Sequence, residues 1–211
     1  MSVMTRYSIA VSRPMALFIL LLFAACGPSE PQVAPLSKNG VILAFGDSLT
    51  YGTGAKPQES YPAVLARLIG HQVIRSGVPG EVSARGLARL PEALDRYRPN
   101  LLILCHGGND FLRRHRRDGT EANIRAMVEL ARARNIDVVL IGVPQPGIWI
   151  TEGAELFARV AKAFGVPYEA EALAGIMTDR SLKSDTVHPN ASGYRKLAEA
   201  VAALLRASGA I

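Results

Sequence analysis

Cysteine is scarce in this chain of 211 residues, which contains only Cys26 and Cys105. Two cysteines are too few for the disulfide framework of a small secreted scaffold. The 4 histidines and 2 cysteines also form no cluster with the spacing of metal ligands. We therefore expect no disulfide network and no metal or other cofactor.

Long hydrophobic runs and a strong excess of one charge are also missing. The uncharged run Met15–Ala25 is well short of the about 20 residues that a transmembrane helix needs. The net charge is +6, of which Arg6 and Arg13 supply two charges, and the other charges are scattered along the chain. So weak and dispersed a charge does not predict nucleic-acid binding.

The first 25 residues have the pattern of an export signal, with a basic start, an apolar run and small residues at its end. The stretch Leu22–Cys26 resembles the bacterial lipoprotein signal, although Phe23 stands where that motif usually has leucine. We expect residues 1–25 to be removed, Cys26 to carry a lipid, and residues 26–40 to form a proline-rich tether. The protein would then be a membrane-anchored lipoprotein facing the periplasm or cell exterior. Secretion after cleavage near the same place is the alternative.

Residues 41–211 alternate short apolar strands with amphipathic helices, and their length suits one domain. We expect strands at 41–45, 73–74, 101–105 and 138–141, with a fifth near 166–168. We expect helices at 61–69, 82–97 with an interruption near Pro91, 121–134, 153–164 and 190–206, and loops at 144–152 and 175–189. This alternation predicts an α/β domain with a parallel sheet covered on both faces. Right-handed crossovers place the end of every strand on one edge.

Several polar residues follow the strands at this edge, where open parallel sheets bind ligands. Ser48 comes just after the first strand and can act as a nucleophile if a base reaches it. His188 is the candidate base, and Asp185 can accept a hydrogen bond from its imidazole and fix the tautomer. Taken alone, Asp185 and His188 could equally mark the start of the last helix.

Candidate donors for an oxyanion follow the second and third strands. Asn109 comes after Gly107–Gly108 and carries an amide, and Gly77 offers a bare backbone N–H. Together with the Ser48 N–H they would make three donors for a tetrahedral intermediate. Ordinary glycine–asparagine turns are the alternative explanation of these two stretches.

The order of four blocks resembles the SGNH hydrolases, also called the GDSL esterase family. The blocks are Gly46–Leu49, Gly77, Gly107–Asp110 and Asp185–His188, and the closest likeness is to the bacterial thioesterase I/lysophospholipase and arylesterase branch. The resemblance implies a flavodoxin-like, three-layer α/β/α domain over residues 41–211. It also implies that Ser48 is the nucleophile, His188 the base and Asp185 its partner, with Ser48, Gly77 and Asn109 as oxyanion donors.

Two further stretches bear on the substrate. The loop around Pro146, Ile148 and Trp149 is unusually apolar and either lines an acyl pocket or packs beneath itself. The basic run Arg113–Arg117 either faces anionic headgroups or is a solvated surface. Cys105 lies in an apolar strand, which indicates a small core residue.

These observations predict a monomeric serine esterase that acts on acyl esters or thioesters, with aryl esters and lysophospholipids among its substrates. A carbohydrate or envelope-polymer O-acetylesterase is the alternative enzyme, and the apolar 144–152 loop argues against it. A lipoprotein that binds lipids without turnover is the alternative outside catalysis. A serine-reactive phosphonate distinguishes this last class, because a pure binder would not be labelled at Ser48.

Overall fold

The computed structural model describes residues 31–145 and 153–211. The expected signal peptide, Cys26 and the first part of the tether lie outside the described residues. Pro146, Ile148 and Trp149 lie outside them as well, so their expected contact with an acyl chain stays a prediction.

Five parallel strands form one sheet in the described part of the chain, in the order β2-β1-β3-β4-β5. Their bounds are β1 Val41–Gly46, β2 Gln72–Gly77, β3 Leu101–Cys105, β4 Asp137–Ile141 and β5 Tyr168–Glu169. This order and the all-parallel pairing are those of flavodoxin-like sheets. The predicted fold class is therefore confirmed.

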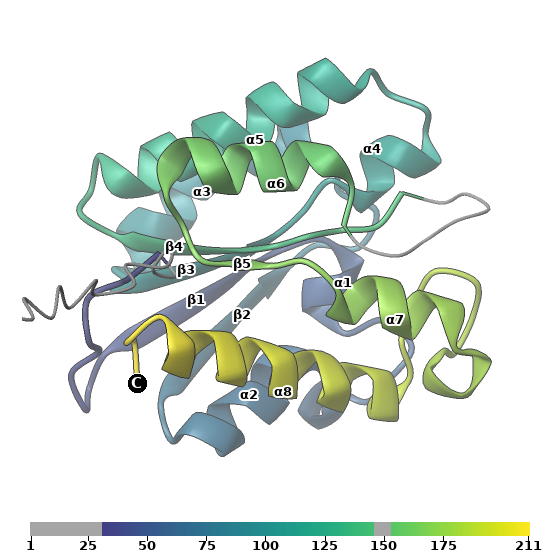
Figure 1. Ribbon diagram of the computed structural model, residues 1–211, viewed down its shortest axis with the longest axis horizontal. Coiled ribbons are helices and arrows are strands. Elements are labelled where there is room, and N and C mark those ends of the chain that lie inside the picture. Colours follow the sequence, from purple (N-terminus) through teal and green to yellow (C-terminus); the bar gives the residue numbers. More distant parts are fainter. Residues whose placement is uncertain (1–30, 146–152) are drawn as a thin grey trace, which may run out of the picture.

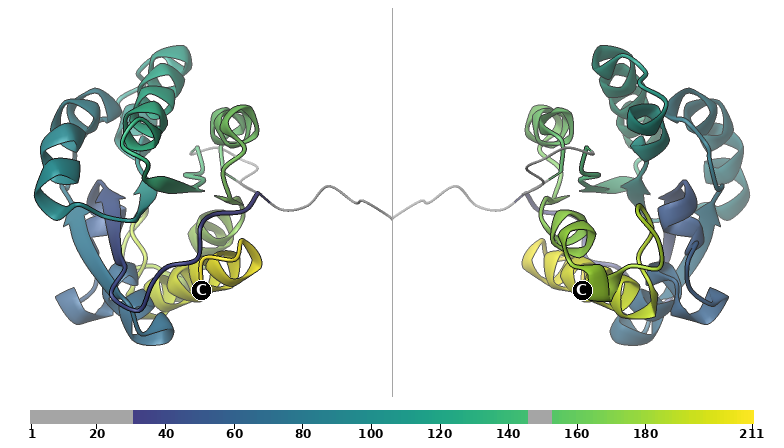
Figure 2. Two further views of the ribbon diagram at one scale, coloured as in Figure 1. Left: turned by 90° about the vertical axis from the view of Figure 1, so that its left-hand side faces the viewer. Right: turned by 90° about the vertical axis from the view of Figure 1, so that its right-hand side faces the viewer.

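Helices cover both faces of the sheet (Figures 1 and 2). On one face lie α2 (Tyr61–Ile69), α7 (Ala172–Thr178) and α8 (Ala191–Ala207). On the other lie α3 (Ser83–Tyr97), α5 (Arg117–Arg132) and α6 (Glu155–Phe164). Two short helices, α1 (Ser48–Tyr51) and α4 (Gly108–Leu112), follow β1 and β3 directly.

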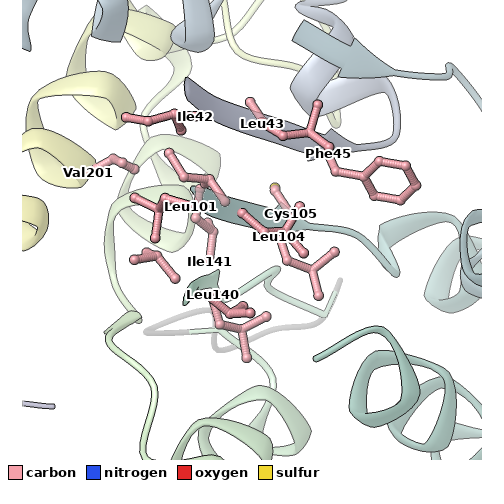
Figure 3. Packing of buried hydrophobic residues seen from close by; sticks show 14 of the residues in the cluster. Ile42, Leu43, Phe45, Leu101, Leu104, Cys105, Leu140, Ile141 and Val201 are labelled. Atoms are coloured by element: carbon pink, nitrogen blue, oxygen red, sulfur yellow. The ribbon is translucent and has the colours of Figure 1, made fainter. Parts of the chain in front are cut away.

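The three central strands β1, β3 and β4 are buried on both faces, which explains why they read as continuous apolar runs. In Figure 3, Ile42 points toward Val201 of α8, whereas Phe45 points away from it. Phe45 instead lies under the guanidinium of Arg89 on α3, 4.0 Å from ring centroid to charge centre. Cys105 is a free, fully buried residue of this core, as expected.

Two expectations about helices were wrong. Pro91 does not interrupt α3, which runs unbroken from Ser83 to Tyr97. The proline costs one backbone hydrogen bond, but the buried neighbours Leu90 and Leu94 keep the helix packed on the sheet. The second wrong expectation is the loop at 175–189, because residues 175–178 belong to α7. This helix forms since Leu173 and Ile176 are buried one helical turn apart.

The start of the described chain lies at the edge where the strands begin, opposite the strand ends. The Ala34 N–H donates to the carboxylate of Asp137, the first residue of β4, at 2.8 Å. Nearby, the N–H groups of Val33 and Leu36 donate to the carbonyls of Ser208 and Ala210. Both ends of the domain therefore meet at this edge. Within residues 31–145 and 153–211, no helix has the length and apolarity needed to cross a bilayer.

Candidate active site

Ser48 is the first residue of α1, at the end of β1. Gly46 allows the close approach to β3, since a Cβ there would overlap the Cys105 carbonyl oxygen. Asp47 caps the short helix by accepting a hydrogen bond from the Leu49 N–H at 3.1 Å. The resulting turn directs the Ser48 hydroxyl into a pocket at the carboxyl edge of the sheet.

The structure brings Ser48, His188 and Asp185 into one hydrogen-bonded chain, as the sequence predicted. The distance from Ser48 Oγ to His188 Nε2 is 3.0 Å, and the distance from His188 Nδ1 to Asp185 Oδ2 is 2.7 Å. A proton on Nδ1 therefore points to the carboxylate, and the lone pair of Nε2 faces the serine hydroxyl. This is the arrangement that a general base needs to accept the proton of Ser48.

The carboxylate of Asp185 is held by its own loop. Its Oδ1 accepts the N–H groups of Val187 and His188, both at 2.8 Å. Although partial burial alone would raise the pKa of Asp185, the hydrogen bonds from the His188 ring and these two N–H groups keep it below its ordinary value. Asp185 is therefore ionised over the whole range in which an imidazole can act as a base.

The loop that carries His188 is fixed by Asn190, the residue just before α8. Asn190 caps this helix by accepting the N–H groups of Ser192 and Gly193, at 3.0 and 3.1 Å. Its amide nitrogen donates in the other direction, to the carbonyls of Ser181 and Lys183. One side chain thus fixes both the start of α8 and the segment of chain that leads to His188.

Asn109 lies on α4, at the end of β3, and faces the same pocket. Its side-chain nitrogen donates to Asp47 Oδ2 at 3.2 Å and to the Glu81 carbonyl at 3.0 Å. The carboxyl group of Asp47 is buried, and this burial raises its pKa. Asn109 is therefore held between the strand end that carries Ser48 and the loop that precedes α3.

Gly77 does not reach the pocket with the other candidates. It pairs with Gly46 in the sheet, and a Cβ at this position would overlap the backbone of Asp47 and Tyr51. Gly80, three residues later, lines the pocket in its place and has a positive φ of 75°. No acceptor for the N–H groups of Gly80 and Ser48 lies among the described residues. Sequence reasoning missed Gly80 because the chain continues past β2 before turning into α3.

The pocket has a volume of about 430 Å³, within the range of small-molecule sites. Ser48 and His188 lie at its polar end. Its wall is mainly apolar and comes from five separate parts of the chain: Leu49, Leu112, Val143 with Pro144, Leu173 with Met177, and Val187. The wall therefore includes Pro144, the first residue of the loop that was expected to line an acyl site.

The basic run Arg113–Arg117 connects the end of α4 to the first residue of α5. Arg113 donates to the Gly80 carbonyl at 2.8 Å, and Arg116 forms an exposed ion pair with Asp118. Within the described residues, no three histidine, cysteine, aspartate or glutamate side chains gather in a way that would hold a metal ion.

Comparisons with known proteins agree with this geometry. Residues 44–196 match the GDSL-like Lipase/Acylhydrolase family. Esterase TesA of Pseudomonas aeruginosa is 29% identical over 172 residues, which cover 76% of this chain and 85% of that protein. A protein of Escherichia coli K12, named thioesterase 1/protease 1/lysophospholipase L1, is 26% identical over 200 residues, covering 92% of this chain and 91% of that protein.

Solved structures give the same result. A crystal structure of TesA superposes with a TM-score of 0.70 at 28% identity, covering 79% of this chain and 98% of that one. The structure of AlinE4, described as an SGNH-hydrolase family esterase, superposes with a TM-score of 0.63 at 31% identity, covering 81% and 97%. The matched region includes Ser48, Asn109 and His188, and the chain belongs to the GDSL-like lipase/acylhydrolase family.

Proposed function

We propose that the protein is a serine esterase that hydrolyses carboxylic esters or thioesters with apolar acyl groups. The observation that carries the proposal is the chain Ser48–His188–Asp185 opening into an apolar pocket of about 430 Å³. The names of the relatives, which include an esterase, a thioesterase and an arylesterase, support the same class of substrate. Lysophospholipids and aryl esters combine such an acyl group with different leaving groups.

The reaction proceeds by two acyl transfers. Ser48 Oγ forms a bond to the carbonyl carbon while its proton passes to His188 Nε2. The tetrahedral intermediate then expels the alcohol or thiol, which takes the proton from His188, and leaves an acyl group on Ser48. Water attacks this ester with His188 again as the base, and the carboxylic acid and free Ser48 are regenerated.

The oxyanion of each intermediate would accept hydrogen bonds from the N–H groups of Ser48 and Gly80 and from the Asn109 amide. Gly80 replaces Gly77 in this proposal, because it lines the pocket and its N–H is unpaired among the described residues. Loss of one such donor typically costs about 2.7–4 kcal/mol of barrier.

The substitution Ser48→Ala tests the nucleophile. We expect kcat/KM on p-nitrophenyl esters to fall by about 10⁴-fold or more, because the other members of the triad cannot replace the missing hydroxyl. A near wild-type value would contradict the assignment. A p-nitrophenyl alkylphosphonate should label Ser48 in the wild type, and failure to label it would favour a lipid-binding protein without turnover.

The same ester series tests the O-acetylesterase alternative. Because the pocket wall is apolar beyond the serine, we expect kcat/KM to rise from acetate toward medium or long acyl chains. A sharp preference for acetate would favour the deacetylase instead.

We also propose that the enzyme is exported and held at a membrane by a lipid on Cys26. The support is the sequence pattern of residues 1–26 and the tether that follows it. Metabolic labelling with an alkyne fatty acid tests this proposal, since Cys26→Ser should abolish the label.

A further inference from the structure

A cluster of three charged or polar side chains, two of them buried, lies beside the catalytic pocket. Arg89 on α3 makes two hydrogen bonds to the carboxylate of Glu81, from Nε at 2.9 Å and from Nη2 at 2.7 Å. His106, which follows β3, places its Nε2 3.1 Å from Glu81 Oε2. The side chain of His106 is fully buried and that of Glu81 is 7% exposed. The proposed reaction gives none of the three a direct part.

The tautomer of His106 follows from its second contact. The Gly107 N–H donates to His106 Nδ1 at 2.9 Å, so Nδ1 presents its lone pair. The proton of the neutral ring therefore lies on Nε2, which donates to Glu81. Although burial alone would raise it, hydrogen bonds from His106 and Arg89 lower the pKa of Glu81 to about 2. The carboxylate thus receives three hydrogen bonds within the cluster.

The cluster joins the ends of three strands. Arg89 also donates to Ser76 Oγ on β2 at 2.9 Å and to the Gly46 carbonyl on β1 at 3.3 Å. His106 directly follows β3. The side chain of Glu81 is therefore fixed relative to the strand ends that precede Ser48, Gly80 and Asn109.

The backbone of Glu81 connects this cluster to the proposed oxyanion donors. Its carbonyl accepts the hydrogen bond from the Asn109 amide at 3.0 Å. Its peptide nitrogen is bonded to the carbonyl carbon of Gly80, whose own N–H would face the oxyanion. A small movement of Glu81 would shift both donors, and misplacement by about 1 Å can cost about 100-fold in rate.

We infer that Glu81 is a positioning residue for the oxyanion hole and that the Nε2–H donor of the buried His106 fixes Glu81 in that role. The inference rests on the proposed function and deepens it. The three hydrogen bonds to its carboxylate hold Glu81 in place, and with it the peptide that follows Gly80 and the carbonyl that accepts from Asn109.

Glutamine and methionine at position 106 have nearly the same shape, so they compare a polar side chain with an apolar one at this place. In His106→Gln the amide can donate to Glu81 from the place of Nε2, whereas His106→Met has no donor. We expect His106→Met to lower kcat about tenfold with KM within about twofold, because a misplaced donor affects the transition state more than the bound substrate. We expect His106→Gln to retain most of the activity.

Three further measurements separate positioning from folding. His106→Asn should behave like His106→Met, since its shorter amide does not reach Glu81, and it replaces the methionine variant if that one does not fold. His71→Gln makes the same chemical change at the edge where β2 begins, and should leave kcat unchanged. The acid limb of the pH–rate profile should not move in any variant, because His188 is untouched.

Equal kcat values for the glutamine and methionine variants, whether high or low, would overturn the inference. NMR signals of the Gly80 backbone amide and the Asn109 side-chain amide give a readout that does not need turnover. They should shift in His106→Met and stay near the wild-type positions in His106→Gln. If the wild type hydrolyses no ester, the proposed function fails, and these shifts still decide whether His106 positions the two amides.

Discussion

At Asn109, both hydrogens of the side-chain amide are engaged when no substrate is bound. The bond to the Glu81 carbonyl measures 3.0 Å and the bond to Asp47 Oδ2 measures 3.2 Å. An oxyanion in the pocket would compete for the hydrogen that Asp47 receives, because the Glu81 carbonyl is held by the cluster beside the pocket. Asp47 thus keeps the amide oriented until a negative charge develops in the transition state, which is the preorganisation that such donors require.

The low pKa of Glu81 predicts a specific acid sensitivity. Because the pKa in the folded protein is about 2, below the ordinary value of 4.5, the folded state binds fewer protons than the unfolded state between these values. Glu81 therefore stabilises the fold above pH 4.5, and this stabilisation, at most about 3 kcal/mol, is lost as pH falls toward 2.

Urea unfolding measured at several pH values between 2 and 5 tests this expectation. In Glu81→Gln the free energy of unfolding should depend less on pH, by up to about 1.4 kcal/mol per pH unit in that window. Glu92→Gln is the matched control, since it makes the same chemical change at an exposed position of α3. An unchanged slope in Glu81→Gln would contradict the assignment.

Among the helices, α7 contributes two residues to the pocket wall. Leu173 and Met177 are four residues apart, so they lie on one face of the helix and both line the pocket. A larger residue at position 177 should shorten the space for an acyl chain. We expect Met177→Trp to shift the optimum of the p-nitrophenyl ester series toward shorter chains, with little change in kcat on acetate.

Thr178→Trp adds the same ring to an exposed position of α7 and should leave the chain-length profile as it is. A wild-type profile in Met177→Trp would exclude this wall from the acyl site.

The sequence predicted the strands better than it predicted the elements that complete the site. Buried strands such as Leu101–Cys105 are recognisable because they are apolar on both faces. Asp185 and His188 were also predictable, since three residues suffice to fold a carboxylate onto an imidazole. Gly80 and α7 were not, because their roles depend on which side of a loop faces the pocket. His106 gave no signal of its own, since its partner Glu81 lies 25 residues away.

At the scale of the whole molecule, the described start of the chain and the pocket lie at opposite edges of the sheet. The chain from residue 33 to 36 is bonded to Asp137 and the last residues of the domain, whereas Ser48 follows the strand end. The five residue steps from Cys26 to Pro31 can span at most about 18 Å. A domain of this size is about 40 Å across. A lipid on Cys26 would thus leave the pocket facing away from the anchoring membrane.

Vesicles test this orientation. Lipidated protein should hydrolyse a long-chain fluorogenic ester placed in its own vesicles no faster than the same ester placed in separate vesicles. Residues 27–211 without lipid provide the reference rate. An advantage of about tenfold for the protein's own vesicles would show that the pocket can reach the anchoring bilayer.

The bonds that join Val33 and Leu36 to Ser208 and Ala210 also determine how the enzyme can be handled. Both chain ends leave the domain from the same side, remote from Ser48 and His188. In a chain of residues 27–211, a purification tag at either end would leave the catalytic residues unobstructed. Fixed to a solid support through such a tag, the enzyme would present its pocket to the flowing solution.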